Sequence, residues 1–186
     1  EGGTSMRSLR LICNAGLAVA LVAAMAAPAA AQETEPEALS MEGTLVGAHW
    51  PDEAAPACDL PGTAWRFKIV ASGELSSLGE VEAYMTHCTV YDPESGAPPT
   101  YYDAMTTFRT ADGDLLAVVH YIPTTEILVG DDGQPTGFVL DGIWQAVGGT
   151  GRFMHAAGTG TVVGAADIPG DITLEYTGEI SLDAPE

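Results

Sequence analysis

The chain has 186 residues, with 26 acidic side chains against 6 basic ones, so its formal net charge is −20 with neutral histidines. A field of this sign repels the phosphates of nucleic acids and anionic lipid headgroups, and we expect neither as a partner. The same charge can attract cations or basic surfaces, or can simply form a well-solvated acidic coat.

The first 31 residues have the pattern of an N-terminal extension followed by a secretory signal peptide. Arg7 and Arg10 form a short basic region, residues 11–27 are apolar, and small residues at 29–31 fit a cleavage site. A single membrane anchor is the alternative, but charges that would stop transfer are missing. We predict a secreted or periplasmic protein without membrane insertion after cleavage. The sequence leaves the origin of residues 1–5 open.

The remaining 155 or so residues are enough for one domain with its own core. Cleavage after residue 31 would leave 25 acidic and 4 basic residues, a net charge of about −21. Residues 32–40 are acidic and contain a proline, which predicts a flexible arm. Residues 41–186 are predicted to form the folded domain.

Two cysteines remain beyond the predicted signal peptide, Cys58 and Cys88. An exported chain meets an oxidising compartment, and two cysteines allow one pairing, so we predict a structural disulfide. Closing a loop of this length contributes roughly 3–4 kcal/mol on the loop-entropy model. Two free thiols are the alternative. A catalytic thiol is disfavoured because no Cys/His site is apparent.

Short alternating runs between turn residues predict a domain built from β-strands. The expected strands are 41–46, 63–72, 81–91, 104–110, 114–122, 138–147, 159–164 and 172–182, with 125–129 as a further strand or a continuation. Pro123 is expected to end its strand, and residues 47–62 are expected to form a loop despite Trp50. No convincing amphipathic helix follows residue 32, although residues 154–157 could form one helical turn.

About eight strands at short spacing predict an all-β fold, a single antiparallel β-barrel, because closure removes exposed strand edges. A β-sandwich is the alternative architecture. It would favour cysteines on facing strands with a tryptophan between them. Cys58 lies in a proline-rich segment instead, which favours the barrel.

The segment 148–153, GGTGRF, is followed by small residues up to Thr161 and predicts a sharp corner at one end of the barrel. Gly149 and Gly151 are expected to supply the backbone angles of this corner. Phe153 is expected to turn inward and plug the barrel end, with Arg152 at the rim.

Four segments, in the same order, resemble secreted bacterial barrels grouped with the allene oxide cyclase and dirigent proteins. The corner is similar to their GGTGRF-type corner, and SSLGEV, TADGDLL and LEYTGEIS at 76–81, 110–116 and 174–181 are similar to three of their strand and hairpin segments. Ser77 stands where that family usually has a histidine, and Ala156–Ala157 stands where it has Ala-Thr. The resemblance implies a β-barrel whose apolar interior can steer a reactive intermediate.

The sequence predicts no metal and no cofactor. The four histidines, at positions 49, 87, 120 and 155, lack close metal-ligand spacing. Asp112–Asp114 and Asp131–Gly133 could suit calcium, but Asp-Gly is also what a tight hairpin needs, and turns are the expected role. The glycine corner lacks the Lys-Ser/Thr of a phosphate-binding loop, and there is no G-x-S-x-G nucleophile elbow.

Steering an intermediate requires a shaped cavity and one or two polar groups, such as a carboxylate beside aromatic rings. The weak catalytic candidates on this basis are Glu82, Tyr84, His120 and Asp141, each of which also fits a structural role. His120 shares an apolar strand face and is expected to be a hydrogen-bonded wall residue.

Two functional hypotheses follow. The first is a non-enzymatic binding or envelope-associated protein, with an apolar small molecule as a candidate partner. The alternative is an allene oxide cyclase- or dirigent-like enzyme that steers cyclisation or coupling of such a molecule. A large interior cavity with a buried carboxylate would favour the enzyme, and a solidly packed interior would favour the first hypothesis. The sequence does not determine the oligomeric state.

Overall fold

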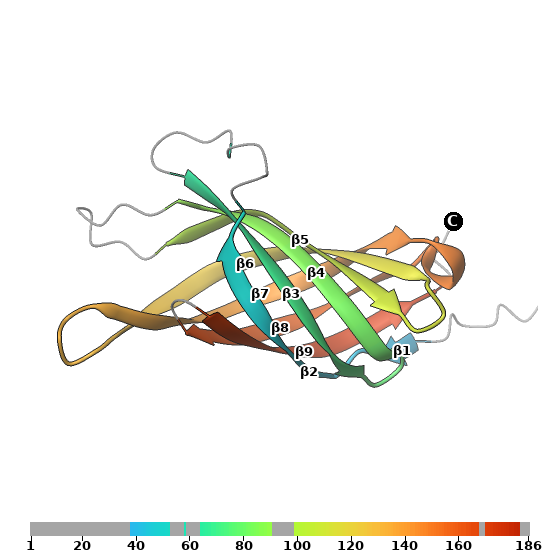
Figure 1. Cartoon of the computed structure of the whole chain (residues 1–186). Helices are drawn as coiled ribbons and strands as arrows, with labels where there is room; N and C mark the ends of the chain where they lie inside the picture. The colour runs from blue at the N-terminus through green and yellow to red at the C-terminus, as the bar shows by residue number, and fades with distance from the viewer. Residues whose placement is uncertain (1–37, 53–57, 59–63, 91–98, 168–169, 183–186) are drawn as a thin grey trace, which may run out of the picture. The chain divides into compact units, whose positions relative to one another are not determined.

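The chain forms a closed antiparallel β-barrel (Figure 1). The computed structural model describes residues 38–52, 58, 64–90, 99–167 and 170–182. The predicted signal peptide and residues 32–37 of the predicted arm lie outside them. The strands are β1 (Ala38–Ser40), β2 (Gly43–Pro51), β3 (Ala64–Leu75), β4 (Gly79–Val90), β5 (Thr100–Thr110), β6 (Leu115–Val129), β7 (Pro135–Gly149), β8 (Ala157–Asp167) and β9 (Gly170–Ser181), with a 3-10 turn η1 (Gly151–Phe153) between β7 and β8.

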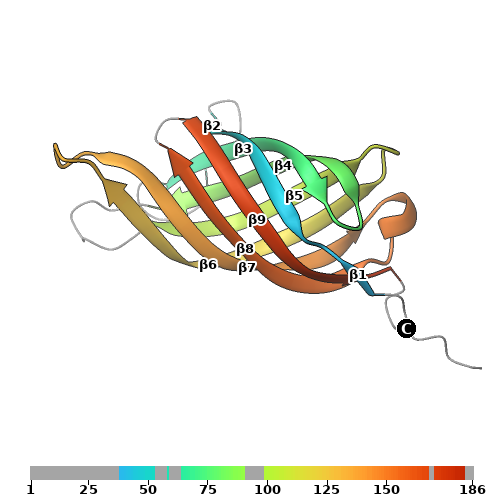
Figure 2. The same ribbon diagram turned by 90° about the horizontal axis from the view of Figure 1, so that it is seen from below.

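The barrel closes through β9, which lies between β8 and β2 (Figure 2). Each strand from β2 to β9 pairs antiparallel with its neighbour in sequence, and the β2–β9 pair joins the two ends of the row. Along one edge of β9, β1 pairs with Glu179–Ser181 and β2 pairs with Gly170–Tyr176, and β8 pairs along the opposite edge. Because β1 and β2 follow each other along the same edge of β9, they occupy one strand position, and the barrel has eight strand positions. This confirms the predicted fold class and excludes the sandwich.

Several strands extend beyond their predicted boundaries, and three differences change the role of a segment. Residues 38–40 were expected to belong to the arm, but they pair with β9 as β1. Trp50 was expected in a loop, but β2 extends to Pro51 and pairs with β3 along its whole length. Pro123 was expected to end a strand, but β6 continues to Val129. The β6–β7 register shifts between Tyr121 and Thr124, so a β-bulge accommodates the proline, which has no N–H to donate.

The two ends of the barrel differ. The turns β3–β4 and β5–β6 and the η1 corner lie at one end, here called the closed end (Figure 1). The other end, here called the mouth, is where β2, β4, β6 and β8 end and where β3, β5, β7 and β9 begin. The β6–β7 hairpin projects beyond the other strands there (Figures 1 and 2). Large side chains fill the interior from the closed end, and several are completely buried: Met41, Leu45, Leu75, Phe108, Leu116, Trp144, Phe153 and Tyr176.

The glycine corner is fastened to the β5–β6 hairpin. The Thr150 N–H donates to the Leu115 carbonyl (2.8 Å), and the Leu115 N–H donates to the Thr150 hydroxyl (3.0 Å). The Arg152 N–H donates to the Asp114 carboxylate (3.2 Å). Gly151 has a φ of +56°, and a Cβ there would meet that carboxylate, so glycine suits this position in both conformation and space. The corner therefore holds η1 against the barrel end.

We expect Phe153→Ala to destabilise the protein by about 3–5 kcal/mol, because the ring is fully buried and its loss leaves a cavity. Arg152 is exposed, and its guanidinium lies 4.7 Å from the centre of the Phe153 ring. Arg152→Ala should cost about 1 kcal/mol or less. Urea unfolding of both variants measures the difference. Equal, small losses would show that the ring does not support the barrel end.

Cys58 and Cys88 form a disulfide, with a Cα–Cα distance of 5.9 Å, which confirms the predicted pairing. It links Cys58, in the β2–β3 connection, to the buried Cys88 of β4. The sequence separation is 30 residues. The bond therefore fixes a connection at the mouth to the barrel wall.

Reduction of this disulfide should lower the free energy of unfolding by roughly 3–4 kcal/mol, because the unfolded chain gains the entropy of an open loop. The melting temperature of reduced protein, compared with that of oxidised protein, measures the effect. As a control, thiol titration of unfolded, unreduced protein should detect no free thiol from this pair. Two free thiols from Cys58 and Cys88 would contradict the assignment.

Candidate functional site

A group of histidine and aromatic side chains occupies the mouth half of the barrel interior. We call it the mouth cluster, and its members are His49, Phe67, His87, Tyr101, His120, Phe138 and Tyr176. They come from seven different strands, and the period-two alternation of each strand directs them inward. Only the closed barrel brings them together.

Three rings from neighbouring strands form one wall of the cluster. Phe67 of β3 lies opposite His87 of β4 in the strand register. The Phe67 ring stacks on His49, with centroids 4.7 Å apart and planes within 10°, and it lies 5.6 Å from His87 at 14°. Across the interior, Phe138 of β7 meets His49 edge-on at 5.4 Å. These contacts make a largely apolar site with histidine nitrogens in its wall.

A hydrogen bond crosses the interior beneath this wall. His120 Nε2 of β6 and the Tyr176 hydroxyl of β9 are 3.1 Å apart. Tyr176 is 1 % exposed, and its ring packs edge-on against Phe108 at 5.2 Å. The predicted wall role of His120 is therefore what the structure shows. Of the four catalytic candidates, it alone points into the barrel.

Two bulges decide which residues of β5 and β6 face the cluster. The β4–β5 register shifts between Thr86 and Cys88, and Asp103, opposite that shift, has a φ of +52°. From Ala104 onward, β5 buries its even-numbered residues, whereas before the bulge Tyr101 turns inward and Tyr102 outward. On β6 the shift at Pro123 similarly turns Thr125 inward. The bulges therefore add two hydroxyl-bearing side chains to the interior.

Sequence reasoning missed this change of phase. An uninterrupted alternation of β5 places Tyr102 inside and Tyr101 outside. The available signals were Asp103, a residue type that tolerates positive φ, and Pro123, which cannot donate to a sheet ladder.

Burial keeps the cluster uncharged near neutral pH. Loss of solvation lowers the pKa of His49 to about 4, that of His87 to about 3 and that of His120 to about 4. The same cause raises the pKa of Tyr101 to about 12 and also raises that of Tyr176. The histidines are therefore neutral, and each retains one ring nitrogen that accepts and one that donates.

Several buried polar atoms of the interior lack a well-formed hydrogen bond to the described residues. They are His87 Nε2, Thr106 Oγ1, His120 Nδ1 and Thr125 Oγ1. The two threonine hydroxyls lie close enough to Tyr176 and Tyr101 to affect their pKa, but without full hydrogen-bond geometry. Most buried polar atoms in proteins have a partner, so this group can bond to a molecule inside the barrel.

The other catalytic candidates do not line the interior. Glu82, Tyr84 and Asp141 are exposed on the outer barrel face, and Glu82 forms an ion pair with Arg109 at 3.7 Å. No acidic side chain is among the fully buried groups of the described residues. These three residues therefore belong to the outer faces of β4 and β7.

The aspartates near the turns serve the turns themselves. The Asp132 carboxylate accepts from the Gln134 N–H (3.0 Å), as Asp114 does from Arg152. Across the described ranges, no group of three or more His, Cys, Asp or Glu side chains is placed to hold a metal ion. Within those ranges there is also no helix of the length and apolarity that a membrane span requires.

Comparison with known proteins gives no relative. No protein family model, no curated protein and no solved structure matches the chain. A functional proposal for this chain therefore depends on the geometry of the site.

Lowering the pH should destabilise the folded protein, because the histidines of the mouth cluster are buried in their neutral form. The folded-state pKa values of His49, His87 and His120 lie below the ordinary value of 6.5, so the unfolded chain binds more protons as pH falls from 6.5 towards 4. Each such proton removes about 1.4 kcal/mol of stability per pH unit. The contribution of the three neutral histidines to the free energy of unfolding is therefore complete above pH 6.5 and declines as the pH falls below that value.

His87→Gln should flatten this dependence by up to about 1.4 kcal/mol per pH unit between pH 6 and pH 4.5. Urea unfolding of both proteins across that range measures the slopes, and the surface carboxylates contribute equally to the two. Identical slopes would show that His87 is not buried in its neutral form.

Proposed function

We propose that this protein is a secreted, acidic β-barrel that binds an apolar small molecule in the mouth half of its interior. The observation that carries the proposal is the mouth cluster, where aromatic rings surround buried polar atoms that lack a well-formed hydrogen bond. Concave, mostly apolar sites with a few convergent polar groups are typical of small-molecule binding, and barrel mouths often hold them.

Within the cluster, His49, Phe67 and Tyr101 are partly exposed, whereas His87 and Tyr176 are buried. A ligand entering at the mouth would meet the wall of stacked rings first and the His120–Tyr176 pair further in. The closed end is packed by Phe153 and its neighbours, so the mouth is the end that suits entry.

The charge distribution supports a ligand without a negative charge. The cluster histidines and tyrosines are neutral near pH 7, so no member offers a counter-ion. The net charge of −20 also repels anions from the surface. The disulfide supports export, because such bonds persist in oxidising compartments.

The second candidate function is a cyclase- or dirigent-like enzyme. It is supported by the resemblance of the corner and three other segments, and by the His120–Tyr176 pair, which could move a proton. Binding without turnover is favoured for two reasons. A general base works best with a pKa near the operating pH, whereas burial lowers the pKa of His120 to about 4. Among the residues that the structure describes, the fully buried set also contains no carboxylate.

Binding of N-phenyl-1-naphthylamine, an uncharged fluorescent aromatic, tests the proposed site. We expect saturable binding with one site per chain. Phe138→Ala should weaken it about tenfold, the equivalent of about 1.4 kcal/mol of lost ring contact. Ile143→Ala is the matched control, because Ile143 lies on the same strand but is exposed on the outer face.

Melting curves of both variants would confirm that they are folded. No saturable binding by wild-type protein, or an equal loss in both variants, would contradict an interior site.

A further inference from the structure

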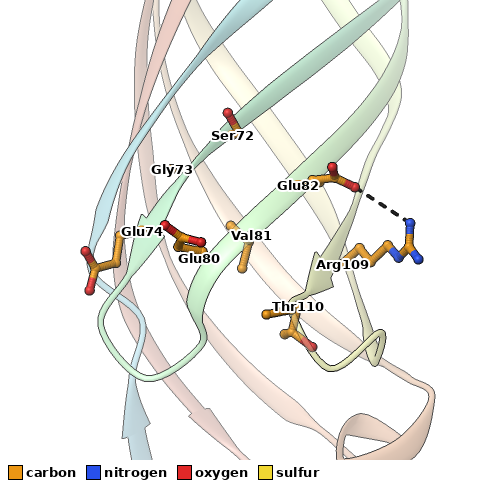
Figure 3. A pocket seen from close by; sticks show the side chains of 9 residues that line it. Ser72, Gly73, Glu74, Glu80, Val81, Glu82, Arg109 and Thr110 are labelled. Carbon is orange, nitrogen blue, oxygen red and sulfur yellow. Dashed lines mark ion pairs between the residues drawn. The ribbon is translucent and has the colours of Figure 1, made fainter.

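The outer face of β2–β5 carries a groove that the proposed binding site does not use. Figure 3 shows the part of this groove that is lined by Glu74, Glu80 and Glu82. Two adjoining hollows, of about 1010 Å³ and about 650 Å³, share Ser72, Glu82 and Arg109 in their walls. The larger hollow lies along the middle of these strands, and the smaller lies towards the closed end. Together they form one continuous surface, here called the outer groove.

The larger hollow has an apolar floor. Val46 of β2, Val70 of β3 and Tyr84 of β4 are 58 %, 45 % and 47 % exposed. Val70 lies directly opposite Tyr84 in the strand register, so their outward side chains are neighbours. Outward positions on a barrel with a packed interior are normally polar, and grouped exposed apolar side chains mark interaction sites.

The smaller hollow is acidic. Glu74 of β3 and Glu80 of β4 lie directly opposite each other, and Glu82 follows two residues along on the same face. Glu82 pairs with Arg109, but neither Glu74 nor Glu80 forms an ion pair with a described residue. Like charges directly opposite on a sheet destabilise it. A positive partner would relieve that repulsion.

We propose that the outer groove binds a cationic, amphipathic peptide segment of a partner protein. Apolar side chains of the segment lie over Val70 and Tyr84, and its lysine or arginine side chains reach Glu74 and Glu80. The polarity of the groove, apolar along the middle and acidic towards the closed end, fixes the direction in which the segment lies. Complementary charge of this kind mainly sets the association rate and the choice of partner.

A second copy of this chain fits the groove poorly. The whole sequence has 6 basic residues against 26 acidic ones. Near the groove, Lys68 and Arg109 are already paired with Asp52 and Glu82. A copy would bring one acidic surface against another, and like-charge contact opposes association.

Fluorescence anisotropy with three labelled peptides tests this proposal on the full chain. The first alternates leucine with lysine, the second replaces lysine with glutamate, and the third replaces leucine with serine. We expect saturable binding of the leucine–lysine peptide only, weakened steeply between 0.05 and 0.5 M salt as the charges are screened.

Substitutions in the outer groove show whether the peptide binds there. Glu74→Gln with Glu80→Gln should weaken it about tenfold while relieving the repulsion between the strands, so folding is not at risk. Asp131→Asn with Asp132→Asn is the matched control, because it removes the same charge from the exposed β6–β7 turn. Val70→Ser should also weaken binding, which a purely ionic contact would not show.

Three outcomes would overturn the proposal. Equal weakening by the two double variants would indicate attraction to the overall charge alone. Equal binding of the glutamate peptide would exclude the acidic hollow. A dimer that Val70→Ser dissociates, without peptide binding, would assign the groove to a second copy. Peptide binding does not depend on the mouth cluster, so Phe138→Ala should leave it unchanged.

Discussion

The pairing of β9 with both β8 and β2 is the constraint on which the rest of the structure depends. It converts a meander of strands into a barrel, because β9 pairs on both sides and joins the two ends of the row. It also creates an inside and an outside. Without closure, His49 of β2 and His120 of β6 would lie on one open sheet face, and Tyr176 would not reach His120 across the interior.

Closure leaves two ends that are stabilised differently. At the closed end, short turns and the glycine corner hold Phe153 over a packed apolar core, and the corner is itself bonded to the β5–β6 hairpin. At the mouth, the interior becomes aromatic and polar, and the disulfide fixes one connection to the wall. The tightly packed apolar core thus lies away from the site, and the mouth carries histidines and hydroxyls without complete hydrogen bonding.

Two surfaces of opposite character share the same strands. On β3 and β4, inward residues such as Phe67 and His87 face the mouth cluster, while outward residues such as Val70 and Tyr84 form the outer groove. The inner surface is uncharged and suits a small molecule, whereas the outer one is apolar and acidic and suits a peptide. Because alternate residues of a strand point to opposite faces, neither surface constrains the chemistry of the other.

The sequence by itself determined the all-β class, the eight-strand barrel, the disulfide and the inward direction of Phe153. The strands, the barrel and the direction of Phe153 depend on local signals, namely period-two alternation, turn residues and the glycine corner, whereas the disulfide follows from the single pairing that two cysteines allow. Which alternating face is inside depends on closure, and for this reason Glu82 and Asp141 were placed among interior candidates although they are exposed. The bulges at Asp103 and Pro123 reverse the phase within single strands, which an unbroken pattern cannot show. The mouth cluster joins residues from β2 to β9, and only the tertiary structure decided that they meet, because ring contacts form across a closed barrel and leave no trace in sequence spacing.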